Sequence, residues 1–273
     1  MQAKFIVVFS SLTLLLSACD KFEYNVYEVD RVKEDPAVTT SYNIDRLLQL
    51  PKKDSVKIVF IGDTQRFYDD VEDLVETVND LPDVDAVIIT GDIADFSAAF
   101  EYELINKQLK LLKVPFLTVI GNHDCLANGT KLYEDIYGPL NYSFTWNGIR
   151  FIMHNTNSRE FNFNGHVPDL NWMQQQLTDV QNYESCIFVS HVPPFDSDFD
   201  SNLEDAYVSL IRNAKNTIFS SNGHRHNFVL DQPYEDGIWY LNTSSPSERI
   251  FSLVSITQNA RKVNSFKCTT VTF

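Results

Sequence analysis

The chain has 273 residues, with 37 acidic side chains against 22 Lys and Arg, so its formal net charge is −15. A protein that grips long nucleic acid needs a basic stripe to neutralise phosphates, and no window of this sequence supplies one. A nucleic acid polymer is therefore disfavoured as a partner. Apolar residues make up 44% of the chain and aromatic residues 13%, which excludes a disordered or fibrous protein.

The first 19 residues have the pattern of an export signal. Met1–Lys4 is short and weakly positive, and an apolar run of 12 residues follows at 5–16. This run is shorter than the roughly 20 residues of a membrane-spanning helix, which indicates a signal peptide over residues 1–18. The ending Leu16-Ser17-Ala18-Cys19 resembles a bacterial lipobox, which implies a lipid on Cys19. We therefore expect an exported lipoprotein of the bacterial cell envelope, anchored to the membrane through Cys19; the alternative is a plain signal peptide with a chance Cys.

Residues 19–54 are charged, lack clear periodicity and contain Pro36 and Pro51, which is typical of a tether. Within it, Ile44–Leu50 leaves open a short helix packed on the domain that we place at 55–273. Three cysteines remain beyond Cys19, an odd number without zinc-site spacing. Cys186 lies in an apolar run, and we predict it to be a small core side chain.

From residue 55, short apolar runs alternate with amphipathic segments. The runs that predict buried strands are Val56–Ile61, Ala86–Thr90, Phe116–Ile120, Ile187–Ser190 and Thr217–Ser220. Helical spacing of apolar residues predicts helices over Asp70–Leu81, Ala98–Leu112 and Leu170–Val180. The strand-rich end comprises Phe228–Leu230, Ile238–Asn242, Ile250–Thr257 and Val263–Val271. We predict an α/β fold with a mixed sheet, continued by antiparallel strands of the same domain.

Polar side chains follow each of the first five predicted strands. The clusters are Gly62-Asp63-Thr64-Gln65, Gly91-Asp92-Ile93-Ala94-Asp95, Gly121-Asn122-His123-Asp124, His191, and Gly223-His224-Arg225-His226. Because the carboxyl ends of strands line the ligand crevice of an α/β sheet, we expect the clusters to form one site. Carboxylate, amide and imidazole groups together are a ligand mixture for ions such as Mn, Fe or Zn.

The order and spacing of these clusters resemble those of calcineurin-like metallophosphoesterases. The motifs of that family run Asp-x-His, Gly-Asp-x-x-Asp, Gly-Asn-His-Asp/Glu, His, and Gly-His-x-His, and the resemblance covers Gly62 to His226. It implies a metallophosphoesterase-like α/β sandwich, with mixed sheets flanked by helices and a strand-rich C-terminal part. It also implies two divalent metal ions (Mn, Fe, Mg or Zn): one on Asp63, Gln65 and His226, one on Asn122, His191 and His224, with Asp92 bridging.

The resemblance further implies hydrolysis of a small phosphomonoester or phosphodiester by a metal-bridging hydroxide. His123 would be the general acid, and Asp124 or Asp95 would orient it or neighbouring ligands. General chemistry agrees, because two cations about 3.5–4 Å apart activate water and stabilise an in-line displacement, and an imidazole can protonate the leaving oxygen.

One ligand departs from the family pattern, since Gln65 stands where most members have His. An amide oxygen is neutral like imidazole but shifts preference from Zn toward Mg, Mn or Ca. Asp95 stands where purple acid phosphatases have Tyr, so we expect no charge-transfer iron site. Two alternatives stay open: a non-catalytic lipoprotein that binds a phosphorylated ligand at a degenerate first metal site, and a surface scaffold with a vestigial site.

Other candidates carry less weight. Asp196–Asp200 has carboxylates spaced as in a calcium loop but lacks the turn Gly and the closing Glu, so we interpret it as a solvated loop. His154 and His166 are candidates for the substrate pocket, although a structural role is favoured. Three cations could meet a second phosphate or a carboxylate of the substrate: Arg66, Arg159 and Arg225.

Overall fold

The computed structural model describes residues 35–259 and 262–273, and the expected signal peptide, Cys19 and the first part of the tether lie outside these ranges. Among the described residues, no helix has the length and apolar character needed to cross a bilayer.

The described strands form two mixed sheets. The first has the order β11 (Lys262–Thr272), β10 (Ile250–Asn259), β1 (Ser55–Ile61), β2 (Ala86–Ile89) and β3 (Phe116–Thr118). The second has the order β4 (Tyr142–Trp146), β5 (Ile149–Met153), β6 (Ser185–Val189), β7 (Thr217–Asn222), β9 (Tyr240–Asn242) and β8 (Val229–Asp231). The sandwich of mixed sheets expected from the sequence is confirmed.

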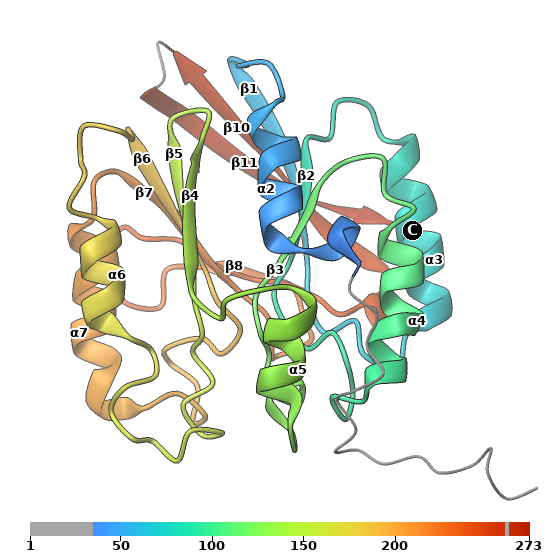
Figure 1. Cartoon of the computed structure of the whole chain (residues 1–273). Coiled ribbons are helices and arrows are strands. Elements are labelled where there is room, and N and C mark those ends of the chain that lie inside the picture. Colours follow the sequence, from blue (N-terminus) through green and yellow to red (C-terminus); the bar gives the residue numbers. More distant parts are fainter. Residues whose placement is uncertain (1–34, 260–261) are drawn as a thin grey trace, which may run out of the picture.

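Helices cover the outer face of each sheet (Figure 1). Those beside the first sheet are α3 (Tyr68–Asp80), α4 (Ala99–Leu109) and α5 (Gly129–Ile136), and those beside the second are α6 (Leu170–Gln176) and α7 (Ser201–Asn213). A central apolar core lies between the two sheets, and one further core lies under each helical layer.

The alternation of side chains along β1 shows why both faces of the first sheet are buried. Val56, Ile58 and Phe60 enter the core between the sheets, whereas Val59 and Ile61 enter the core under the helices. Successive side chains of a strand point to opposite faces, so a strand covered on both sides reads as a continuous apolar run. In β6 the same alternation buries Cys186 completely on the helical side, which confirms its predicted core position.

The strand-rich C-terminal part divides between the sheets. β10 pairs antiparallel with β1 and with β11, which extends the first sheet, whereas β9 pairs parallel with β7 in the second. The β4–β5 hairpin of the second sheet was not predicted from the sequence. Its turn is Asn147-Gly148, with both residues at positive φ, and an Asn-Gly pair between alternating apolar residues is the usual signal for such a hairpin.

The expected tether boundary at residue 54 differs from the structure. The 3-10 helix η1 (Pro36–Val38) and the helix α2 (Thr40–Leu48) pack on the domain, and the Thr39 side chain caps α2 by accepting from the Tyr42 amide. Val38 and Leu47 lie in the apolar cores. The short packed helix left open at Ile44–Leu50 is therefore present, and it begins earlier, at Thr40.

Neighbouring leucines of α2 provide a test of this docking. Leu47 is 1% exposed and Leu48 is 51% exposed. We expect Leu47→Ala to lower the free energy of unfolding by about 2–5 kcal/mol, because it leaves a cavity in the core. Leu48→Ala should change it by less than about 0.5 kcal/mol. Urea unfolding followed by circular dichroism measures both, and equal values for the two variants would contradict the docking.

Candidate metal centre

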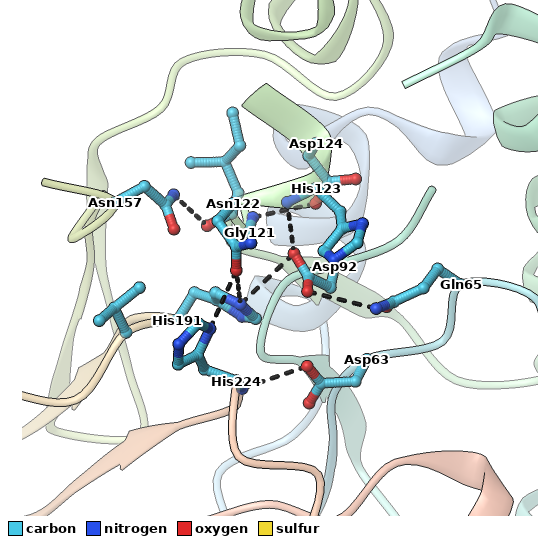
Figure 2. A network of polar contacts seen from close by, with 12 residues as sticks. Asp63, Gln65, Asp92, Gly121, Asn122, His123, Asp124, Asn157, His191 and His224 are labelled. Carbon is cyan, nitrogen blue, oxygen red and sulfur yellow. Dashed lines mark hydrogen bonds and ion pairs between the residues drawn. The ribbon is translucent and has the colours of Figure 1, made fainter. Parts of the chain in front are cut away.

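The polar clusters predicted at the strand ends converge at one edge of the sandwich. Asp63 follows β1, Asp92 follows β2 and His191 follows β6, so the two sheets contribute together. Ligand atoms of these three side chains all lie within 4.8 Å of one another. Figure 2 shows them facing Asn122 and His224, with Gln65 beside Asp92.

Asp92 lies at the middle of the network and is 1% exposed. Its Oδ1 accepts from the backbone amide of His123 at 2.9 Å and lies 3.3 Å from His191 Nε2, while its Oδ2 accepts from Gln65 Nε2 at 3.3 Å. Burial alone would raise its pKa, but the neighbouring imidazoles of His191 and His123 outweigh burial and lower the pKa of Asp92. The carboxylate is therefore held in its charged form.

The first group of expected ligands surrounds Asp63, which is fully buried. Its Oδ1 lies 3.3 Å from His226 Nε2 and accepts from the His224 amide at 3.2 Å. Its Oδ2 has no hydrogen-bond partner, and neither has the buried Oε1 of Gln65. A buried carboxylate or amide oxygen without a partner costs free energy unless a ligand satisfies it. These oxygens therefore fit a cation.

The second group centres on Asn122. Its Oδ1 lies 2.9 Å from His191 Nε2 and 2.9 Å from His224 Nδ1. Ligand atoms about 3 Å apart suit one ion at metal–ligand distances of about 2.1 Å. The structure thus brings together the three side chains that the resemblance assigned to one ion.

His191 shows why this group requires a positive centre. Its Nδ1 lies 2.7 Å from the carbonyl of Thr90, so Nδ1 carries the hydrogen and donates it. Its Nε2 then faces two oxygens, and only a second proton or a metal ion makes that contact favourable. Burial opposes a charged ring, but the carboxylates of Asp92 and Asp63 outweigh burial and raise the pKa of His191 to about 10. The residues present therefore fit a bound divalent cation, which would replace this proton.

The loops that carry these ligands are packed closely against one another, with no room for a larger side chain at their glycines. A Cβ added to Gly121 would overlap the amide and carboxylate of Asp92, and one added to Gly91 would lie 2.6 Å from His191 Nδ1. Several non-glycine ligands also have positive φ: Asp63, Asp92, His224 and His226. Such conformations cost on the order of 1–3 kcal/mol each and occur preferentially at functional sites.

The two acids left open as partners of His123 have different roles in the structure. His123 Nδ1 lies 2.8 Å from the carbonyl of Asp95, to which it donates, and 3.4 Å from the Asp95 carboxylate. Asp124 accepts instead from the amides of Ile93, Ala94 and Gly121. Asp95 thus orients His123, whereas Asp124 fixes the backbone beneath the metal ligands.

Two features of the site were missed in the sequence. Asn157 is fully buried and donates through Nδ2 to the carbonyl of Ile120, which ties it to the loop that carries Asn122 (Figure 2). Asp196 and Asp198, which we took for a solvated loop, lie 3.6 and 3.5 Å from His224 Nε2. That interpretation is wrong, because both carboxylates face an imidazole of the centre. No local pattern signals either contact.

The remaining candidates are either paired with carboxylates or exposed. Arg66 pairs with the Asp95 carboxylate at 2.6 Å, and Arg159 pairs with Asp198 at 2.8 Å. Arg225 is exposed and lies over the Phe195 ring. His166 is exposed.

Comparisons with known proteins agree with this geometry. The family described as calcineurin-like phosphoesterase matches residues 56–228, so the chain belongs to that family. The family is one of phosphoesterases, as its description states.

Three individual proteins that resemble the chain share between 15% and 31% of its residues over the matched regions. A "probable glycerophosphodiester phosphodiesterase" of Arcobacter nitrofigilis is 31% identical over 123 residues, which span 42% of this chain and 45% of that protein. A "probable cyclic nucleotide phosphodiesterase" of Fibrobacter succinogenes is 26% identical over 71% of this chain and 82% of its own length. Among solved structures, a dimetal phosphatase of Danio rerio has a TM-score of 0.57 at 15% identity, over 80% of this chain and 99% of its own. This last likeness shows the fold.

His154, a pocket candidate, is part of the core instead. Its Nδ1 donates to the carbonyl of Ile152 at 3.1 Å, and its Nε2 accepts from the Tyr207 hydroxyl at 2.8 Å. Burial lowers the pKa of His154 to about 4. The folded protein therefore binds this proton less readily than the unfolded chain, and stability is lost as pH falls from about 6.5 toward 4.

We expect this loss to be on the order of 3 kcal/mol. His154→Gln, which keeps a donor and an acceptor without titrating, should flatten the pH dependence of the free energy of unfolding between pH 7 and 4.5. The exposed His166→Gln is the matched control and should leave the slope unchanged. Urea unfolding at four pH values measures it, and identical slopes in all three proteins would contradict the assignment.

Proposed function

We propose that this protein hydrolyses a small phosphodiester with two divalent metal ions held at the strand ends. The observation that carries the proposal is the arrangement of ligand atoms around Asp92. On one side, an oxygen of Asp63 and an oxygen of Gln65 have no hydrogen-bond partner. On the other side, the side-chain oxygen of Asn122 faces ring nitrogens of His191 and His224. Asp92 offers one oxygen to each group.

Bound divalent ions at such a centre supply Lewis acidity, which activates water and stabilises charge on the phosphoryl oxygens. The chain itself supplies the ligands that would hold the two ions. Asp63, Gln65 and His226 would hold one ion, and Asn122, His191 and His224 the other, with Asp92 between them. The amide oxygen of Gln65 favours Mn or Mg over Zn at the first position.

His123 provides the acid. Because its Nδ1 hydrogen is given to the Asp95 carbonyl, Nε2 is the nitrogen that can transfer a proton to the leaving oxygen. The pairing of Arg66 with the Asp95 carboxylate holds this support in place. The His123 side chain is 31% exposed, so a substrate can reach it.

The diester class is favoured by the relatives, which are named for glycerophosphodiesters and for cyclic nucleotides. The charges near the site agree with a substrate of low charge. Of the three candidate cations, Arg66 and Arg159 are paired with carboxylates, which leaves Arg225 as the candidate for a second phosphate. A diester carries one negative charge, whereas a monoester carries up to two.

The proposal is tested with protein loaded with Mn, Mg or Zn and offered bis(p-nitrophenyl) phosphate, p-nitrophenyl phosphate, a glycerophosphodiester and a 3',5'-cyclic nucleotide. We expect diesters to be cleaved with Mn or Mg, and Asp92→Asn to abolish turnover. His123→Gln should lower kcat by about 10²–10⁴-fold for the alkyl diester but far less for the nitrophenyl diester, because nitrophenolate leaves without a proton.

Equal losses of kcat on both diesters would contradict the acid role of His123. Loaded protein that binds two ions and cleaves none of the four esters would leave the non-catalytic binding protein as the better interpretation.

We also propose that the protein is exported and anchored to the membrane by a lipid on Cys19, on the strength of the signal pattern and the Leu-Ser-Ala-Cys ending. Cys19→Ser removes the thiol that would carry the lipid. We expect it to move the protein from the membrane fraction to the soluble fraction on ultracentrifugation and to stop incorporation of labelled palmitate. Unchanged membrane association and labelling in the variant would contradict the anchor.

A further inference from the structure

We infer that Asp196 and Asp198 are positioning residues for His224 and thereby set the affinity of the second metal position. The inference rests on the proposed metal centre. It concerns the loop between β6 and α7, whose carboxylates lie within ion-pair distance of the outer nitrogen of a metal-ligating imidazole.

The two ring nitrogens of His224 face different partners. Nδ1 lies 2.9 Å from Asn122 Oδ1, among the other ligand atoms. Nε2 points the other way, 3.5 Å from Asp198 Oδ2 and 3.6 Å from Asp196 Oδ1. A neutral imidazole ligates through the nitrogen that has no hydrogen, so ligation through Nδ1 leaves a hydrogen on Nε2. That hydrogen faces the two carboxylates.

The carboxylates are held in place from a second direction. Arg159 Nη1 lies 2.8 Å from Asp198 Oδ2, and the Arg159 amide donates to the Asp198 carbonyl at 3.2 Å. The Asp198 amide in turn donates to Asp196 Oδ1 at 3.1 Å. The side chains of Asp196 and Asp198 are 20% and 14% exposed. Neither carboxylate can turn into solvent without giving up these contacts.

A carboxylate that accepts the second N–H of a ligating histidine fixes the tautomer and the ring orientation and makes the ligand more basic. His191, the other imidazole of this position, uses a neutral backbone carbonyl, that of Thr90, for the same purpose. His224 is therefore the ligand of the second position that has anionic support. Loss of that support should weaken the second ion specifically.

Direct ligation of a further cation by the same three side chains is the competing interpretation, since their ligand atoms also lie within 4.8 Å of one another. Arg159 opposes it. Its guanidinium already neutralises Asp198 and would repel a cation at this place. The positioning role leaves every one of these contacts intact.

The test compares the full-length protein with Asp196→Asn, Asp198→Asn and the double variant, and uses the exposed Asp205→Asn on α7 as the matched control. Asn keeps the shape of Asp and removes its charge. Titration of metal-free protein with Mn²⁺ by calorimetry should show two ions in every protein. We expect one of the two binding steps to lose about 10–100-fold in affinity in the double variant, and the other step and the control to be unchanged.

A second readout is spectroscopic. Histidine ¹⁵N spectra recorded at a Mg²⁺ concentration that fills both positions of the wild type should show His224 protonated at Nε2 there. The double variant, whose second position is then only partly filled, should show a mixture of protonation states. Asp196→Asn leaves the Arg159 pair intact, so it keeps the test valid if Asp198→Asn does not fold.

Two ions bound with equal affinity in wild type and double variant would overturn this inference alone. A third ion that binds the wild type and is lost in the variant would overturn it in favour of direct ligation. A wild-type chain that binds no ion would instead overturn the proposed function.

Discussion

The structure depends on how it compensates three carboxylates that are buried beside one another at the end of the first sheet. Asp63, Asp92 and Asp124 are at most 1% exposed. Asp124 is satisfied by backbone amides and the Tyr102 hydroxyl, while Asp92 is offset by the imidazoles of His191 and His123. One oxygen of Asp63 is left without a partner. A metal-free fold would have to bear that cost, and a bound cation removes it.

This compensation requires two sheets. The first sheet provides the carboxylates and Asn122, while the second provides His191 and His224, and the apolar core between the sheets fixes the spacing of the two sets. The glycine contacts at the loop crossings leave no room for adjustment, as the close approach of Gly91 to His191 shows. Packing in the core therefore sets the distances between ligand atoms at the edge.

Apolar runs and motif spacing predicted the strands of the centre, because fully buried strands need continuous apolar residues and the glycine-led clusters follow them directly. Segments whose sequence signals are short and mixed were harder to predict. The β4–β5 hairpin was not predicted, although Asn147-Gly148 and the alternation of apolar with polar residues along β4 signal it. Helix α2 was left only as an open alternative over Ile44–Leu50, because Leu47 is buried by partners distant in sequence.

The sequence by itself determined the class of site, because metal chemistry restricts which residue types can follow each strand and in which order. It also contains the pattern on which the proposed export signal rests. Only the tertiary structure decided which acid supports His123, that His154 belongs to the core, and that Asp196 and Asp198 reach His224. These are contacts between segments far apart along the chain, and their geometry follows from the packing of the two sheets, which no local pattern encodes.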